Sequence, residues 1–138
     1  MEIVLHDPMD LVPGGGSPFD PAEPLAGLNR RLSRTGVLTG EIAYPEPVDF
    51  PGEERPSRTG ALVVAKATLD RDLPYELLCY AAGNPVFPHD GTSDQWFDHQ
   101  QFDAYQSLGR QLGLLATAAG QRLERGLAAR AQSRSYRG

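Results

Sequence analysis

Two apolar stretches in the first half of the chain predict a pair of β-strands. Residues 37–44 alternate between apolar and polar positions and stop at Pro45, as in a strand with one buried face. The positions that share that face are Leu38, Gly40, Ile42 and Tyr44. Residues 61–67 are almost continuously apolar, which is typical of a strand covered on both faces. The sixteen residues 45–60 exceed a tight hairpin loop, so we expect an antiparallel pair with a long connection.

The N-terminal segment combines a strand signal with a loop signal. Residues 2–5 are β-prone and end before Pro8, because proline lacks the N–H that a strand ladder needs. Nine of the twenty residues 8–27 are Gly or Pro, which predicts a mobile surface loop without packed structure. Leu25 and Leu28 mark a predicted short helical turn at the end of this segment.

A short helix is predicted over residues 75–82. Asp72 is placed to cap it, Pro74 suits its first turn, and residues 83–85, Gly-Asn-Pro, are a stop signal. Its expected apolar face consists of Leu77, Leu78, Ala81 and Ala82. Cys79 has apolar neighbours on this helix, so we expect a buried, inert thiol.

A long helix is predicted to begin at Asp98, which has Gln101 three residues later in the spacing of a capping box. Apolar positions then recur at intervals of three or four and form one helical stripe. They are Phe102, Tyr105, Leu108, Leu112, Leu115, Ala119 and Leu123. We interpret the stripe as core packing rather than a ligand site. Beyond Leu127 the stripe is lost, and residues 128–138 are predicted to fray as an Arg-rich tail.

Composition and charge narrow the function classes. A length of 138 residues allows one domain, and a net charge of −5 argues against a general nucleic-acid-binding surface. Residues 1–120 carry a net charge of −9 and residues 121–138 a net charge of +4, so only the tail is basic. The single cysteine excludes an internal disulfide, and the sequence lacks both a signal-peptide pattern and an apolar run long enough to span a membrane. We therefore expect a cytoplasmic protein.

A dense aromatic motif lies just before and within the predicted long helix. It reads Asn84-Pro85-x-Phe87-Pro88-His89, then Asp94-Gln95-Trp96-Phe97, Gln101-Phe102, Tyr105 and Leu108-Gly109. This pattern resembles the C-terminal region of bacterial patatin-like phospholipases. Upstream, residues 40–45 and 61–69 are similar to two strands that precede the motif in that family. The resemblance covers roughly residues 36–110.

The resemblance implies a family of lipid acyl hydrolases that cleave esters with a Ser–Asp dyad. The nucleophile of that dyad lies on a Gly-x-Ser-x-Gly turn, where small neighbours expose the serine hydroxyl. This chain contains no Gly-x-Ser-x-Gly sequence, so we expect no catalytic residue in it. The resemblance then implies a truncated form of the family, without the catalytic half.

Three polar features are alternative candidate sites. Residues 14–17, Gly-Gly-Gly-Ser, could cradle an oxyanion, but their proline-rich surroundings favour a flexible loop. Asp90 is followed by Gly91, like the dyad base of the family, but it stands at a different place in the motif. His89, Asp94, Asp98 and His99 are possible metal ligands, although their spacing matches no metal signature and fits helix caps and turn contacts better. We therefore expect no metal ion and no cofactor.

These observations predict an α/β fold, a partial patatin-like layered structure with two or three strands, a short helix and a long C-terminal helix. Residues 1–35 form the strand end and mobile loop, residues 36–127 the patatin-like part, and residues 128–138 the frayed tail. The motif residues are assigned structural roles in an aromatic cluster that docks the loop on the long helix. They are Phe87, Pro88, His89, Thr92, Asp94, Gln95, Trp96, Phe97, Phe102 and Tyr105.

The predicted function is that of a non-catalytic structural portion of a patatin-like acyl hydrolase. Its expected partner is a patatin-like catalytic segment or a second copy of the chain. One alternative is a non-enzymatic protein-interaction module. Another is peripheral contact with an anionic membrane through the basic tail. The residues of that tail are Arg122, Arg125, Arg130, Arg134 and Arg137.

Overall fold

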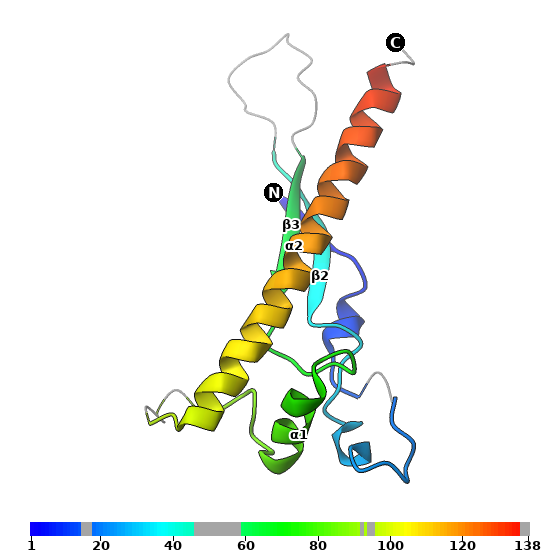
Figure 1. The fold of residues 1–138 in the computed structure, drawn as a ribbon. Coiled ribbons are helices and arrows are strands. Elements are labelled where there is room, and N and C mark those ends of the chain that lie inside the picture. The colour runs from blue at the N-terminus through cyan, green and yellow to red at the C-terminus, as the bar shows by residue number, and fades with distance from the viewer. Residues whose placement is uncertain (15–17, 46–58, 92, 94–95, 136–138) are drawn as a thin grey trace.

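The computed structural model shows a mixed α/β fold in which a small antiparallel sheet lies against a long helix (Figure 1). The residues it describes are 1–14, 18–45, 59–91, 93 and 96–135. The strands β1 (Glu2–Leu5), β2 (Val37–Ala43) and β3 (Thr59–Ala65) follow one another in the order β1-β2-β3. Both strand pairs are antiparallel, which confirms the predicted pairing of the second and third strands.

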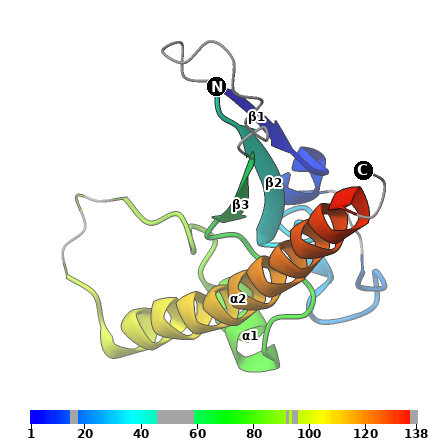
Figure 2. The same ribbon diagram turned by 90° about the horizontal axis from the view of Figure 1, so that it is seen from above.

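The long helix covers one face of the sheet. Helix α2 (His99–Ser135) contacts β2 and β3, and a Cβ atom built on Gly120 would lie 3.8 Å from the Val63 side chain. Because directly opposed residues of neighbouring strands share a face, Thr39 of β2 lies on the same face as Val63. Figure 2 shows α2 crossing that side of the sheet.

The opposite face of the sheet is apolar and only partly covered by the described residues. Leu38 is buried, but Ile42, Leu62 and Val64 are half-buried and Ile3 is 51% exposed. The apolar run of the third strand predicts cover on both faces, but none of the residues of β3 is buried, so the described residues do not supply that cover. The continuous apolar run arises at the edge of a sheet with a helix on one side only.

The start of the short helix differs from the prediction, whereas the start of the long helix agrees with it. Helix α1 (Tyr75–Gly83) begins after Pro74, which takes the N-cap position, and Asp72 makes no side-chain cap. The preceding turn is instead closed by Asp70, whose Oδ1 accepts the Asp72 N–H at 2.8 Å. Helix α2 begins as expected, because the Gln101 N–H donates to Asp98 Oδ1 at 2.7 Å.

Helix α2 extends past Leu127, into the residues predicted to fray. The helix continues to Ser135, and Arg130 donates to the Glu41 carboxylate of β2 at 2.9 Å. Alanine and arginine are strong helix formers, so the loss of the apolar stripe leaves the helix propensity of residues 128–135 high. The prediction from the apolar stripe missed this continuation, because the stripe marks only the part of a helix that has a buried face.

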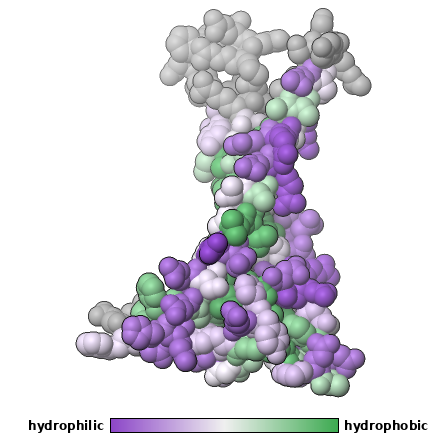
Figure 3. All heavy atoms as spheres, viewed as in Figure 1, coloured by the Kyte–Doolittle hydropathy of each residue, from purple (hydrophilic) through white to green (hydrophobic). Residues whose placement is uncertain are grey.

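The main core lies below the sheet, where the N-terminal half of α2 meets α1 and the short 3-10 helix η2 (Ala26–Leu28). Its residues are Leu25, Leu28, Leu32, Leu69, Leu73, Leu77, Leu78, Ala81, Phe87, Ala104, Leu108 and Leu112. This end of the molecule is broad, and the sheet with the C-terminal half of α2 forms a narrower part above it (Figure 3).

The segment 8–27 contains more packed structure than its Gly and Pro content predicted. A second 3-10 helix, η1 (Pro8–Leu11), follows β1, and the partly buried Phe19 packs against the core. The backbone of Phe19 exchanges two hydrogen bonds with the Asn29 side chain, at 3.2 and 2.9 Å. The predicted helical turn at Leu25 and Leu28 is confirmed by η2.

Candidate functional site

The aromatic motif forms a cluster around one fully buried ring. Phe87 is 2% exposed and lies edge-on to Tyr80 of α1, with ring centroids 5.2 Å apart, and to Tyr105 of α2, at 4.9 Å. Phe97 packs edge-on against the other side of Tyr105 at 5.8 Å. Such edge-to-face pairs add to the stabilisation that burial gives. The expected docking of the motif loop on the long helix is present in these residues.

Two aromatic residues of the motif are largely exposed. Trp96 is 91% exposed and Phe102 is 60% exposed, so the expectation that they pack against the apolar face of the helix is wrong. The buried face of α2 begins instead at Ala104 and Leu108, because α1 approaches the helix there. The stripe also fails at Leu115, which is 41% exposed.

The other motif residues divide between buried and exposed positions. Pro88 is buried, whereas His89 is exposed and its N–H donates to the Val86 carbonyl at 2.7 Å, as expected for a tight turn. Thr92, Asp94 and Gln95 lie outside the described residues.

Asp90 is held by Tyr105 in a reciprocal arrangement. The Tyr105 hydroxyl donates to Asp90 Oδ2 at 2.6 Å, and the Asp90 N–H donates back to that hydroxyl at 3.2 Å. Burial, and then the hydrogen bond to Asp90, raise the pKa of Tyr105 above its usual value. By accepting this hydrogen bond, the Asp90 carboxylate fixes the end of the motif loop on α2.

Arg31 anchors the same loop from the N-terminal segment. Its guanidinium donates to the carbonyl oxygens of Ala81 at 2.7 Å, Asn84 at 3.2 Å and Phe87. Burial lowers the pKa of Arg31 below its usual value. One weak signal for this contact is present in the sequence, an arginine between the apolar positions Leu28 and Leu32, but the carbonyl groups that it reaches cannot be identified from sequence.

The metal hypothesis finds no support in the described part of the chain. Within residues 1–14, 18–45, 59–91, 93 and 96–135, no three side chains of the His, Cys, Asp and Glu types lie close enough to share an ion. Asp94 of the proposed set is not described, and Asp98 serves as the cap of α2. The oxyanion hypothesis for residues 14–17 cannot be placed, because residues 15–17 are outside the described residues.

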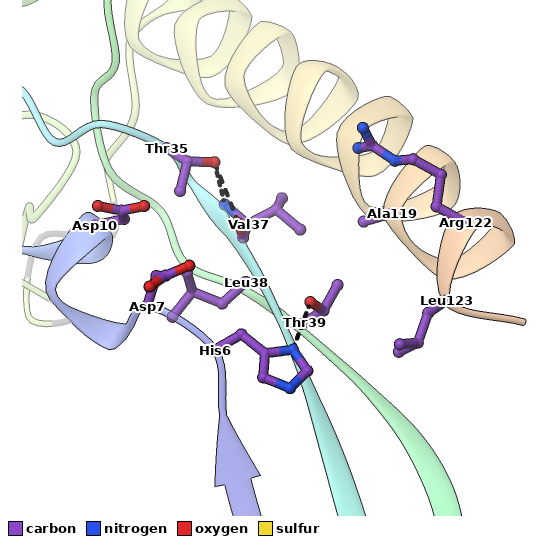
Figure 4. A pocket seen from close by; sticks show the side chains of 10 residues that line it. All are labelled: His6, Asp7, Asp10, Thr35, Val37, Leu38, Thr39, Ala119, Arg122 and Leu123. Carbon is purple, nitrogen blue, oxygen red and sulfur yellow. Dashed lines mark hydrogen bonds between the residues drawn. The ribbon is translucent and has the colours of Figure 1, made fainter. Parts of the chain in front are cut away.

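A polar groove that the sequence did not predict lies between η1, β2 and the second half of α2. It has a volume of about 600 Å³, and its polar lining residues are His6, Asp7, Asp10, Thr35, Thr39 and Arg122. Figure 4 shows Arg122 on the α2 side and the two aspartates on the η1 side, with Thr39 between them. The groove was missed because its residues come from three distant segments.

The chemistry of this groove favours binding of polar groups over nucleophilic catalysis. His6 Nδ1 lies 3.3 Å from Thr39 Oγ1, so a hydroxyl and an imidazole are adjacent. However, the contact is exposed to water, whereas acyl transfer needs a nucleophile, a base and oxyanion donors aimed at one carbonyl. Asp7 takes a left-handed conformation, with φ 49° and ψ 52°, which aspartate tolerates at turns.

A second groove, of about 480 Å³, lies between α1 and α2 next to the aromatic cluster. Leu77 and Ala104 form its apolar floor, and Glu76 and Asp103 give it an acidic rim.

Cys79 is exposed on α1, which contradicts the expected buried thiol. The helix turns Cys79 outward because its neighbours Leu77, Leu78 and Ala81 occupy the inner face.

None of the helices in the described residues has an apolar stretch sufficient to cross a bilayer. Comparisons with protein-family models, with curated proteins and with solved structures find no match to this chain.

Proposed function

We propose that this chain is a non-catalytic structural portion of a patatin-like acyl hydrolase. The proposal begins from the motif at residues 84–109 and its resemblance to the C-terminal region of that family. In this role the chain supplies strands and a long helix to a larger α/β structure, and a separate segment supplies the serine nucleophile and its aspartate base.

The observation that carries the proposal is how the motif residues are used. Phe87 is buried between Tyr80 and Tyr105, and Arg31 donates to three carbonyl oxygens around the loop that holds Phe87. Asp90 is bound to the Tyr105 hydroxyl at 2.6 Å, an arrangement that favours a structural role over that of a free base. The use of Phe87, Tyr105 and Asp90 for contacts within the chain supports a packing role for this part of the motif, although Trp96 and Phe102 are exposed.

The uncovered face of the sheet gives a second reason. Ile3 and Leu5 of β1 are 51% and 39% exposed, and Ile42 and Leu62 beside them are only half-buried. Contiguous apolar surface of this kind is typical of contacts with another protein segment. In the proposed function, the catalytic segment covers this face.

A non-enzymatic interaction module is a second candidate function, and the same sheet face favours it. It differs from the first candidate only in the partner, which would have no acyl hydrolase activity. Contact with an anionic membrane receives less support. Arg130 of the basic tail is paired with Glu41, and Arg122 lines the polar groove with two aspartates.

The test begins with the purified chain alone, assayed with p-nitrophenyl butyrate and with phospholipid. We expect no turnover. Activity that disappears in a Ser17→Ala variant would overturn the proposal, since it would place a nucleophile in this chain.

In the second step, the DNA on both sides of the gene is sequenced and searched for a segment that encodes Gly-x-Ser-x-Gly. Co-expression with such a segment should give ester hydrolysis that neither piece has alone. Arg31→Ala should weaken the complementation. Arg30→Ala is the matched control, since it changes an exposed neighbour. An unrelated neighbouring protein that binds the chain would favour the interaction module instead.

A further inference from the structure

Strand β3 presents an open hydrogen-bonding edge. The Lys66 N–H donates to the Gly36 carbonyl at 2.9 Å, which fixes the phase of the ladder between β2 and β3. Because backbone groups alternate along a strand, Gly60, Leu62 and Val64 bond toward β2. The N–H and C=O groups that point away from β2 belong to Thr59, Ala61, Val63 and Ala65.

In the described part of the chain, no segment pairs with this outer edge, and β3 is the last strand of the sheet. In Figure 2, β3 lies beside β2 on one side and has no strand on its other side. Unpaired strand groups of this kind form a template for another strand.

The edge of β3 lacks the features that usually prevent strand addition. Thr59–Ala65 contains no charged residue and no proline, and its pairing with β2 is continuous, without a bulge. The other sheet edge differs. Strand β1 begins with Glu2 and is followed by the left-handed Asp7 and by Pro8, which limits any added strand to a short stretch.

We propose that β3 pairs with β3 of a second copy of this chain, antiparallel and about a two-fold axis at Leu62. In this register Thr59 lies opposite Ala65 of the second copy, and Ala61 lies opposite its Val63. In this register each of the four residues that point away from β2 lies opposite another such residue of the second copy. Each of their N–H groups therefore meets a carbonyl oxygen of the other strand. The seven-residue strand is therefore complementary to itself.

The side chains along the seam suit this pairing. Ala61 and Ala65 are small and exposed, so a second strand can approach the edge on the face of α2. On the opposite face the two Leu62 side chains meet at the axis and Val64 flanks them, which joins the partly exposed apolar faces of two sheets. An identical strand is the occupant, because its outward N–H and C=O groups pair with those of β3. It also brings no charged side chain to the seam.

The experiment measures the oligomeric state of the full chain by sedimentation velocity over a range of concentrations, with no catalytic segment present. The wild-type chain should form a dimer. Ala61→Lys places a charge on the seam at a position that is exposed in the single chain, and it should weaken the dimer at least about tenfold. Ala61→Thr keeps a neutral, β-prone residue there and should leave the dimer intact.

Amide hydrogen exchange identifies the surface. The N–H groups of Ala61 and Val63 should be protected in the wild-type dimer and exchange rapidly in the Ala61→Lys variant. The N–H groups of Leu62 and Val64, which bond to β2, should stay protected in both and show that the variant is folded. A monomer at every concentration overturns the proposal. So does a dimer that Ala61→Lys leaves unchanged, or one in which Ala61 and Val63 exchange freely. None of these three results depends on ester hydrolysis, so the proposed function stands or fails separately.

Discussion

Gly40 lies so close to Val4 that a Cβ atom built on it would stand 2.5 Å from the Val4 carbonyl oxygen. That oxygen belongs to the backbone of β1, which cannot move without loosening its pairing with β2. Glycine within a strand often marks such a close approach of another backbone. The pairing of β1 with β2 therefore requires a residue without a Cβ atom at position 40.

We expect Gly40→Ala to lower the free energy of unfolding by about 1–3 kcal/mol, because the added methyl group pushes β1 away from β2. Chemical denaturation measures the change. Gly113→Ala is the matched control, since nothing lies within 4 Å of its Cβ position and it stands inside α2. There, alanine should raise the stability by about 0.5–1 kcal/mol. Equal effects at the two positions would contradict the explanation.

Phe87→Ala should lower the free energy of unfolding by about 3–5 kcal/mol, because it empties the centre of the aromatic cluster. Trp96→Ala, in the same motif, should change it by less than about 0.5 kcal/mol, since Trp96 is 91% exposed. Urea denaturation of both variants tests the assignment. A costly Trp96→Ala change would show that the ring is buried.

Tyr105→Phe should cost about 1.5–3 kcal/mol of stability, because it removes a hydrogen bond to a carboxylate and keeps the ring. A double-mutant cycle with Asp90→Ala measures the coupling, and the two changes should be clearly less than additive. The raised pKa of Tyr105 gives a second readout. A folded-state pKa above the unfolded value means that this stabilisation is present below the unfolded pKa and is lost as the pH rises through the folded one.

Arg31→Lys should lower the stability by about 1–3 kcal/mol, although the charge is kept. A lysine ammonium lacks the planar fork that reaches the carbonyl oxygens of Ala81, Asn84 and Phe87 together. Arg30→Lys changes an exposed neighbour and should be neutral within about 0.5 kcal/mol. If the two substitutions cost the same, the three carbonyl contacts do not stabilise the loop.

Asp70 should make the stability depend on pH. Its side chain is buried, and within the described residues its Oδ2 has no hydrogen-bond partner. Burial raises the pKa of Asp70 above its ordinary value, against the opposing hydrogen bond from the Asp72 N–H. A raised folded-state pKa means that the protonated form favours folding, so the contribution of Asp70 is fully present below the unfolded pKa and is lost as the pH rises through the folded one.

Denaturation of the wild type and of Asp70→Asn at a series of pH values tests this. The wild type should gain stability relative to the variant as the pH falls from about 7 to about 4, near the ordinary carboxyl range. Asp103→Asn, at an exposed site on α2, serves as the control for replacing a carboxylate by an amide. A constant difference between the wild type and Asp70→Asn would mean that the Asp70 carboxyl titrates alike in both states.

Local signals in the sequence predicted most elements of this fold. The alternation at residues 37–44 gave β2, the apolar run gave β3, and Asp98 with Gln101 marked the first residue of α2. Each of these signals involves neighbours within a few positions, where backbone geometry and hydrogen bonding are decided locally.

Burial was predicted less well, because it depends on what other segments cover. Phe102 continues the stripe of α2 and Cys79 has apolar neighbours, yet both are exposed. Helix α1 meets α2 at Ala104 and Leu108 instead, and the inner face of α1 is filled by Leu77 and Leu78. A periodic pattern locates an apolar face, but the neighbouring element selects which part of it is covered.

By itself, the sequence determined an α/β chain with an antiparallel strand pair, two helices and a packed aromatic motif, since these follow from local periodicity and turn residues. Only the tertiary structure joined Arg31 to the carbonyl groups of residues 81–87, Tyr105 to Asp90, and His6 to Thr39. It also placed β3 at the edge of the sheet, with outward backbone groups and one face against α2. These relations connect residues far apart in the chain, and their free energy comes from burial and hydrogen bonds that exist only after the segments have met.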